Sequence, residues 1–253
     1  MLTSKTLIIS PHMDDAVISL GGYIKLCKDP VSVIDVFSND PWIKPGFITG
    51  RTDDAIKARK KEELRNQKMY SYHLEFWDFA AAWMGRGYLS WQDNVNWSND
   101  ARLIKALERR ILDTVSWGKF TTVIFPLAIG GHTDHVICNH IALSIGENCR
   151  RKFKTLFFED MPYATNPTLW PKSPLWSQIV NKKMKARRFN VAEVVMLKNK
   201  AISNYNSQFN KEKLDRIAHF LYKQNNDNKL HKFKEKYLKQ HYLIEERLWE
   251  FLT

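Results

Sequence analysis

The sequence predicts an α/β protein in which helices flank a largely parallel sheet. Short apolar runs typical of buried strands alternate with longer segments whose apolar residues recur at helical spacing. This alternation is typical of β-α-β units with parallel strands. The length of 253 residues suits one large α/β domain, and 44% apolar with 26% charged residues are ordinary values for a globular protein.

Expected strands and helices alternate over the first 160 residues. Each expected strand is a short apolar run between turn-forming neighbours, and these runs are residues 6–10, 31–37, 74–77, 122–126 and 155–158. Helices are expected at residues 16–26, 53–70, 100–115 and 135–145; the second is strongly charged, and the third has apolar residues three or four positions apart on one face. The order implies a Rossmann-like sheet whose strands are mostly parallel.

The remainder of the chain is less regular. Four prolines oppose regular structure in residues 162–174, so a loop is expected there. An apolar run at residues 191–197 is expected to form a strand, with helices after it. We therefore divide the chain into a main α/β domain at residues 1–208 and a basic helical C-terminal extension at residues 209–253, packed on the same domain.

Positive charge is concentrated towards the C-terminus. The net charge is +12, and residues 181–253 hold 17 Lys and Arg against 8 Asp and Glu. Such a stretch can attract nucleic acid, an anionic membrane surface or a phosphorylated substrate. Basic residues on a solvated helix face are the simpler interpretation, and no nucleic-acid recognition motif accompanies them. We therefore expect no specific nucleic-acid partner.

The sequence also predicts a cytoplasmic protein without a membrane span. Residues 1–5 lead directly into a strand, and no apolar run approaches the twenty or so residues that cross a bilayer. Cys27, Cys138 and Cys149 are odd in number and lack CxxC spacing, so we expect them to be reduced and structural. The sequence is compatible with a homo-oligomer.

A first group of metal-type ligands, His12, Asp14 and Asp15, follows the strand at residues 6–10. Imidazoles and carboxylates are common ligands of divalent metals, and a catalytic zinc site typically uses three protein ligands plus water. His12 and Asp15 can supply two ligands, while Asp14 can act as the general base beside the metal-bound water. Alternatively, the two aspartates only cap the following helix.

A second group, His132, Asp134 and His135, follows Gly130-Gly131 after the strand at residues 122–126. Either histidine can complete a metal site, but each can also be a hydrogen-bonded core residue, and Asp134 can be a helix cap. In an open α/β sheet, the carboxyl ends of parallel strands converge on one crevice, so groups roughly 120 residues apart can meet there. We expect the two groups to form one metal site.

With these two groups, the chain resembles the LmbE-like or PIG-L-type de-N-acetylases, which use zinc to remove N-acetyl groups from amino sugars. The paired His-x-Asp-Asp and His-x-Asp-His motifs carry most of the resemblance. Supporting matches occur along most of the chain, at Gly21-Gly22, Arg59–Glu62, Phe158–Ala164, Lys198, Ala201-Ile202 and Tyr205–Gln208.

The resemblance implies a role for each residue of the two groups. His12, Asp15 and His135 would bind Zn²⁺, and Asp14 would be the base that activates water. His132 would stabilise the oxyanion and protonate the departing amine. Asp134 would orient His132 and raise its pKa. Zn²⁺ is favoured, although another divalent transition metal such as iron or cobalt suits the same ligands.

The resemblance also implies three substrate contacts, at Arg59, Asp78 and Tyr163. Polar forks at a pocket rim suit sugar hydroxyls, but Arg59 can instead pair with Glu62 or Glu63 on a helix surface, and Asp78 can cap a turn. Tyr163 would line the pocket. Two acidic neighbours, Glu159 and Asp160, can either order the metal ligands or pair with the basic C-terminal region.

The expected function is zinc-dependent hydrolysis of an N-acetyl group from an amino sugar or sugar conjugate, such as N-acetylglucosamine, with a small N-acetylated molecule as partner. The alternatives are a deacylase of another small-molecule amide (an antibiotic, nucleoside or peptide conjugate) and a non-catalytic polyanion-binding protein. Met13, the turn at residues 37–40 and the aromatic segment at residues 80–97 depart from the commonest form of the family. Because such loops shape the pocket, substrate identity does not follow from the motifs.

Overall fold

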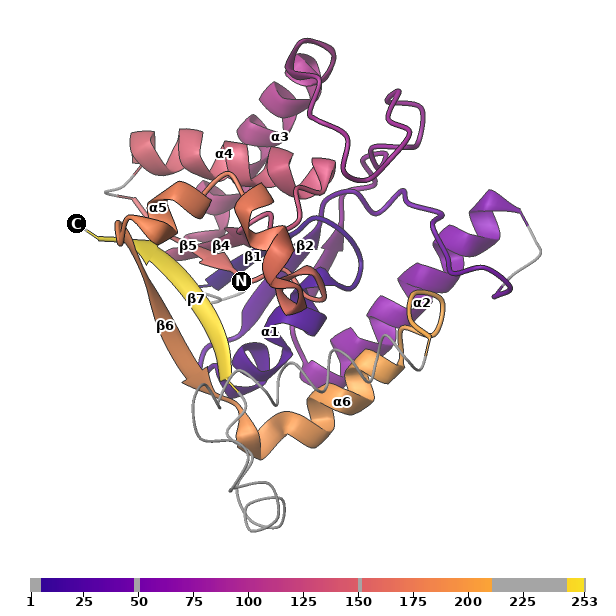
Figure 1. Ribbon diagram of the computed structural model, residues 1–253. Coiled ribbons are helices and arrows are strands. Elements are labelled where there is room, and N and C mark those ends of the chain that lie inside the picture. The colour runs from indigo at the N-terminus through magenta and orange to yellow at the C-terminus, as the bar shows by residue number, and fades with distance from the viewer. Residues whose placement is uncertain (1–5, 48–50, 150–151, 211–244, 253) are drawn as a thin grey trace.

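The protein is a seven-stranded sheet with helices on both faces, as the computed structural model shows (Figure 1). The structure describes residues 6–47, 51–149, 152–210 and 245–252. The strand order is β3-β2-β1-β4-β5-β7-β6. The strands are β1 (Thr6–Ser10), β2 (Val31–Asp35), β3 (His73–Phe76), β4 (Thr122–Pro126), β5 (Lys154–Phe158), β6 (Met184–Asn190) and β7 (Glu245–Phe251).

The five strands β1 to β5 are parallel, which confirms the predicted fold class. Strand β1 pairs with β2 on one side and β4 on the other, so the strand order reverses between β1 and β4. In open α/β sheets, ligands bind at the carboxyl ends of the strands beside such a reversal. The antiparallel pairs β5·β7 and β6·β7 extend the sheet at one edge.

Helices cover the sheet in two layers. On one face α1 packs against α2 and α6, and on the other α3 packs against α4, which contacts β4 and β5 (Figure 1). The helices are α1 (Asp15–Leu26), α2 (Thr52–Tyr70), α3 (Trp97–Gly118), α4 (Thr133–Cys149), α5 (Trp176–Val180) and α6 (Val195–Ser203). Helices α1 to α4 lie where the sequence predicts them, within a few residues at their ends.

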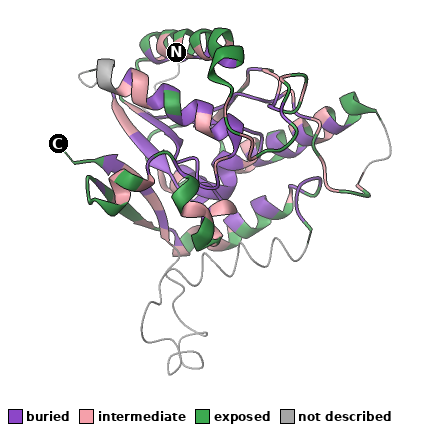
Figure 2. Cartoon of the chain, turned by 45° about the horizontal axis from the view of Figure 1, so that its top comes forward, coloured by how far each residue is buried: buried purple, intermediate pink, exposed green. Residues whose placement is uncertain are grey.

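The core lies between these layers. Leu7, Ile8 and Ile9 of β1 are completely buried, as are Val33 of β2 and Phe125 of β4. Strands covered on both faces need side chains that are apolar in both directions, which explains their continuous apolar runs. Figure 2 shows the buried residues gathered along the sheet and the exposed ones on the outer sides of the helices.

The prediction of a strand at residues 191–197 is wrong. These residues form a 3₁₀ turn, η3 (Ala192–Val194), and the start of α6, whose buried Lys198, Ala201 and Ile202 lie at helical spacing. The strand is instead β6, seven residues earlier, where several basic side chains obscure the apolar pattern. Charged side chains are common on edge strands because they oppose edge-to-edge association. The predicted loop at residues 162–174 contains two short 3₁₀ helices, η1 (Tyr163–Thr165) and η2 (Pro167–Lys172).

The predicted helical C-terminal extension is not confirmed. Residues 211–244 lie outside the described part, and residues 245–251 form strand β7, not a helix. This strand lies between β5 and β6, so the last described residues belong to the same sheet as the metal-type motifs. The boundary between residues 1–208 and 209–253 stays a prediction. Among the described residues, no helix combines the length and apolar character that crossing a bilayer requires.

Candidate metal centre

The candidate site lies where β1 and β4 end. The segment after β1 turns sharply into α1, because the Ser10 hydroxyl donates to the carbonyl of His12 (2.7 Å) and accepts from the amide of Ala16 (3.2 Å). The segment after β4 leads through Gly130 and Gly131, both at positive φ, into α4. Glycine adopts this backbone conformation without steric cost. The two turns bring the two predicted groups of ligands together.

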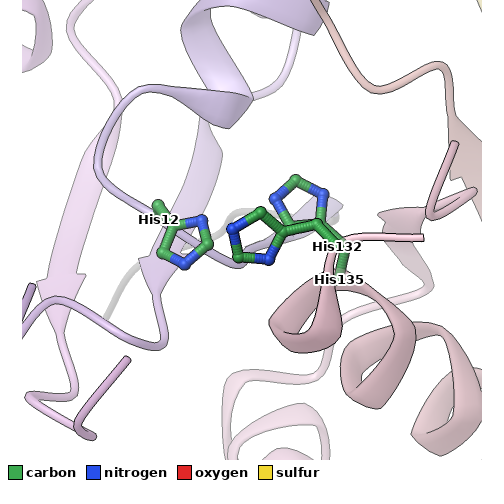
Figure 3. A group of neighbouring side chains, drawn as sticks. All are labelled: His12, His132 and His135. Atoms are coloured by element: carbon green, nitrogen blue, oxygen red, sulfur yellow. The ribbon is translucent and has the colours of Figure 1, made fainter. Parts of the chain in front are cut away.

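Three imidazoles, those of His12, His132 and His135, converge at this point (Figure 3). Each offers a ring nitrogen, and these atoms lie within 4.8 Å of one another. The ring centroids are 4.7 Å apart for His12 and His132, 4.8 Å for His132 and His135, and 5.3 Å for His12 and His135. All three residues are buried, so the expected convergence of two sequence-distant motifs is observed.

The carboxylate of Asp15 lies between two of these rings. Its Oδ2 atom is 3.4 Å from Nδ1 of His12 and 3.2 Å from Nε2 of His135. Two ligands of a tetrahedral ion with bonds of about 2.0–2.1 Å lie about 3.3–3.4 Å apart. Two spacings of the predicted set, from Asp15 to His12 and from Asp15 to His135, therefore suit zinc ligands, and His132 lies near enough to both histidines to be an alternative ligand.

A second pair of carboxylates fixes the two outer rings. Asp134 Oδ2 is 3.0 Å from Nε2 of His12, and Asp160 Oδ1 is 2.6 Å from Nδ1 of His135. These contacts leave Nδ1 of His12 and Nε2 of His135 facing Asp15. The His135 Nε2 atom is buried and has no hydrogen-bond partner among the described residues. Buried polar atoms are normally paired, and a divalent cation would satisfy this nitrogen, so the residues fit a metal.

The charges of the site are strongly coupled. Burial lowers the pKa of His12, but hydrogen bonds to Asp134 and Asp15 outweigh it and raise the pKa to about 9. Burial likewise opposes protonation of His135, but the charge of Asp15 raises its pKa to about 10. Because metal ligands must be deprotonated, a bound cation would displace these protons.

Asp14 pairs with an arginine, whereas its neighbour Asp15 lies beside two histidines. The Asp14 side chain is 12% exposed, and its Oδ1 atom is 3.8 Å from Nη2 of Arg59. Burial, followed by the charge of Asp15, raises the pKa of Asp14 to about 7. A carboxylate of this kind can accept a proton near neutral pH.

The contacts of Asp134 differ from those the resemblance implies. Its carboxylate contacts His12 instead of His132, and only its backbone amide donates to Nδ1 of His132, at 3.3 Å. The pKa of His132 is well below its ordinary value, because burial and then the charges of His12 and His135 outweigh the effect of Asp134. The Asp134 carboxylate therefore makes no hydrogen bond to His132, although its charge does raise the pKa of that ring, and the predicted catalytic role of Asp134 stays a prediction.

The predicted substrate residues fall into two classes. Tyr163 borders the centre, with its ring 5.8 Å from that of His135 and stacked 5.0 Å from Trp91. Asp78 is half-exposed, adopts a positive φ, and pairs with Ser38 (2.9 Å) and Lys60 (2.5 Å). Both partners are distant in sequence, so the side chain of Asp78 does not cap a local turn, and its contact with substrate stays a prediction.

Arg59 is 2% exposed and lies between Asp14 and Asp40. It is not on a helix surface, and Glu62 and Glu63 accept hydrogen bonds from other residues, so the alternative pairing is wrong. Sequence reasoning gave Asp40 no role, although an acidic residue shortly after a buried strand was a usable signal. Its ion pair holds Arg59 beside Asp14.

Two interpretations were open for Glu159 and Asp160, namely ordering of the metal ligands and pairing with the C-terminal region. Asp160 fits the first and Glu159 fits the second. Asp160 orders the site through its hydrogen bond to His135, while Glu159 accepts from the indole of Trp249 (2.9 Å) and lies 3.8 Å from Arg247. Arg86 is a further residue that sequence reasoning missed. It contacts Asp134 from the aromatic segment, where no local pattern distinguished it from a surface arginine.

The fold and these contacts place the chain among α/β proteins whose parallel sheet carries a candidate metal centre at its carboxyl edge. The model of the PIG-L family, described as GlcNAc-PI de-N-acetylase, matches residues 7–145. This match covers more than half of the chain and both histidine motifs, so the chain belongs to the PIG-L family, whose deacetylases are zinc enzymes.

Comparisons with individual proteins agree with this assignment. A 2'-N-acetylparomamine deacetylase from Streptomyces fradiae is 28% identical over 167 residues, which are 63% of this chain and 58% of that protein. The crystal structure of a deacetylase from the biosynthesis pathway of teicoplanin superposes with a TM-score of 0.73 at 22% identity, over 96% of both chains.

The same fold also carries a different reaction. The 4-carboxy-2-hydroxymuconate hydratase GalB from Pseudomonas putida superposes with a TM-score of 0.65 at 15% identity, over 98% of this chain and 97% of that one. The fold alone therefore does not define the chemistry, which has to be argued from the site.

Proposed function

We propose that this chain is a zinc-dependent N-deacetylase that hydrolyses the N-acetyl group of an amino sugar or sugar conjugate. One observation carries the proposal: Oδ2 of Asp15 lies 3.4 Å from Nδ1 of His12 and 3.2 Å from Nε2 of His135, two buried ring nitrogens, and Asp14 precedes Asp15 in the sequence. Membership of the PIG-L family and similarity to a deacetylase of an acetylated aminoglycoside support the reaction and the substrate class.

In this proposal His12, Asp15 and His135 hold the metal. Bound zinc supplies Lewis acidity and lowers the pKa of a bound water. Asp14 takes the proton from the attacking water, and Arg59, 3.8 Å away, favours its ionised form. Asp134 and Asp160 hold the two histidine rings in the orientation that the metal needs.

His132 is the proposed hydrogen-bond donor to the oxyanion. Its Nδ1 atom accepts the backbone N–H of Asp134, so the neutral ring carries its proton on Nε2. A hydrogen-bond donor at this position stabilises the negative charge that develops on the acetamide oxygen. The departing amine takes the proton that Asp14 removed from the attacking water, so the neutral His132 ring keeps its own proton. Trp91 stacks on His132 with centroids 5.8 Å apart and shields this ring from solvent.

Two alternatives follow from other parts of the molecule. Trp83, Trp91 and Trp97 are 38–47% exposed, and this aromatic surface would suit a larger amide than an acetylated monosaccharide. Polyanion binding is less well supported, because Lys185 and Arg187 of β6 pair with Glu250. The small N-acetylated partner, the cytoplasmic location and the oligomeric state remain predictions.

The test combines metal content with amine release from N-acetylglucosamine and 2'-N-acetylparomamine. We expect wild type to bind one zinc and release amine. His135→Ala should lose the metal, whereas Asp14→Asn should keep it and lower turnover by about 10²–10⁴-fold. Asp113→Asn, an exposed aspartate of α3, is the matched control and should change neither quantity.

Each contrary result points to a different error. Unchanged turnover in Asp14→Asn would remove Asp14 from the mechanism. Zinc binding without amine release from either sugar would direct the search to larger amides. Absence of zinc from reconstituted wild type, together with salt-sensitive binding to heparin, would favour the polyanion-binding alternative.

A further inference from the structure

One side chain from the segment between β3 and α3 reaches the buried carboxylate of the second motif. Arg86 donates from Nη1 to Oδ1 of Asp134. The other edge of its guanidinium forms a fork with Asp100, in the first turn of α3, with Nη2 at 2.9 Å and Nε at 3.2 Å. Arg86 therefore bridges the N-terminal turns of α3 and α4.

The guanidinium is held in place from several sides. It lies over the rings of Phe37 and Tyr88, with centroid distances of 5.2 and 5.4 Å. The Tyr88 hydroxyl donates to Asp100 at 2.5 Å and so fixes the far anchor of the fork. The Arg86 side chain is only 12% exposed. A planar group bound on both edges and stacked on aromatic faces is rigid, which a surface arginine is not.

This contact determines how Asp134 presents its two oxygens. With Oδ1 occupied by Arg86, the Oδ2 atom accepts the amide of Ala82 (2.9 Å) and faces Nε2 of His12 (3.0 Å). The engaged Nε2 atom leaves Nδ1 of His12 free to face Asp15 at 3.4 Å. The orientation of the His12 ring is thus connected to Arg86 through one carboxylate.

We propose that Arg86 is a positioning residue: by orienting Asp134 it selects Nδ1 as the nitrogen with which His12 binds the metal. The inference rests on the proposed metal-dependent function and extends it to a residue outside both histidine motifs. If Arg86 has this role, residues 80–97 orient a metal ligand in addition to contributing aromatic side chains beside the site.

A purely structural role of Arg86 would have different consequences. If Arg86 only fastened residues 80–97 to α3, its loss would lower stability and leave the bound metal unchanged. Residues that hydrogen-bond to metal ligands typically change metal affinity by about 10- to 100-fold when they are replaced. Metal affinity and the visible absorption spectrum of the Co²⁺-substituted protein therefore separate the two roles.

The experiment compares Arg86→Met and Arg86→Lys with wild type in the full chain. We expect Arg86→Met to bind zinc about 10- to 100-fold more weakly in competition with a chelator and to shift the Co²⁺ absorption bands. Arg86→Lys keeps a charge beside Asp134 and should give an intermediate affinity. The control is Arg110→Met, which removes an exposed arginine stacked on Trp77 at 4.3 Å and should alter neither readout.

Wild-type zinc affinity and an unshifted Co²⁺ spectrum in Arg86→Met would overturn the inference. If that variant does not fold, Asp100→Asn makes the same test, because it removes the far anchor of the guanidinium and leaves Asp134 intact. Wild type that binds no metal would instead contradict the proposed function itself.

Discussion

Two buried groups of ionisable residues in the described part of the chain differ in how completely their atoms are paired. In the first, beyond β1 and β4, Nε2 of His135 has no hydrogen-bond partner among the described residues. In the second, between α2, α6 and β7, Glu63 accepts from the hydroxyls of Tyr72 and Tyr205. Lys198 and Glu246 form a fully buried ion pair in the same region.

The second group supplies a partner for each of its carboxylates. Glu246 accepts the amides of Gly22 (2.8 Å) and Tyr23 (2.6 Å) as well as the Lys198 ammonium, and it thereby ties β7 to α1 and α6. Glu62 accepts both the amide and the hydroxyl of Ser207. Burial of charge without a partner is costly, so the paired carboxylates of the second group stabilise the fold, whereas the three converging imidazoles of the first group offer ligand atoms to a metal.

The largest expected effect tests the paired group. Lys198→Met leaves Glu246 buried without its cation, and loss of one partner of a buried pair costs about 3–5 kcal/mol. We expect the free energy of unfolding in urea to fall by that amount, while the molecules that remain folded keep their zinc. Lys200→Met, an exposed neighbour on α6, is the control and should have little effect. Equal stability of both variants would show that this pair is not structural.

The next effect tests the unpaired group. Asp160→Asn keeps the shape of the side chain but weakens its hold on Nδ1 of His135, 2.6 Å away. We expect zinc affinity to fall about 10- to 100-fold, which is about 1.4–2.7 kcal/mol of binding free energy. Stability of the zinc-free protein should hardly change. The adjacent Glu159 contacts β7 and not the histidines, so Glu159→Gln should retain wild-type zinc affinity. An equal loss of zinc affinity in both variants would show that Asp160 has no special role at the metal centre.

The smallest expected effect is a loss of stability on replacing Glu63, a second carboxylate of the paired group. Glu63→Gln retains one oxygen acceptor and can donate its amide to one tyrosine hydroxyl, so about 1 kcal/mol should be lost. Thermal unfolding of this variant and of the exposed Glu193→Gln measures the difference. A loss of zinc from Glu63→Gln, without a loss of stability, would show that Glu63 belongs to the metal centre and that the two groups are not separate.

Local signals explain what could be predicted from the sequence. Strands β1 to β5 are short apolar runs, and α3 carries buried apolar residues at helical spacing, so these elements are defined by residues near them in the chain. The two motifs at His12–Asp15 and His132–His135 directly follow β1 and β4, and the parallel order of the strands requires their ends to meet. The sequence by itself therefore determined the α/β class, the family resemblance and the candidate ligands.

Only the tertiary structure decided which partners these residues have. Strand β7 joins the sheet between β5 and β6 although it is the last described element of the chain. Asp134 contacts His12, Asp40 holds Arg59, and Arg86 reaches Asp134 from a segment without regular structure. These contacts join residues that are far apart in sequence, and no local periodicity encodes them. They depend on the placement of α2, which carries Arg59, and of α4, which carries Asp134, beside the ends of the strands, and this placement sets the distances within the site.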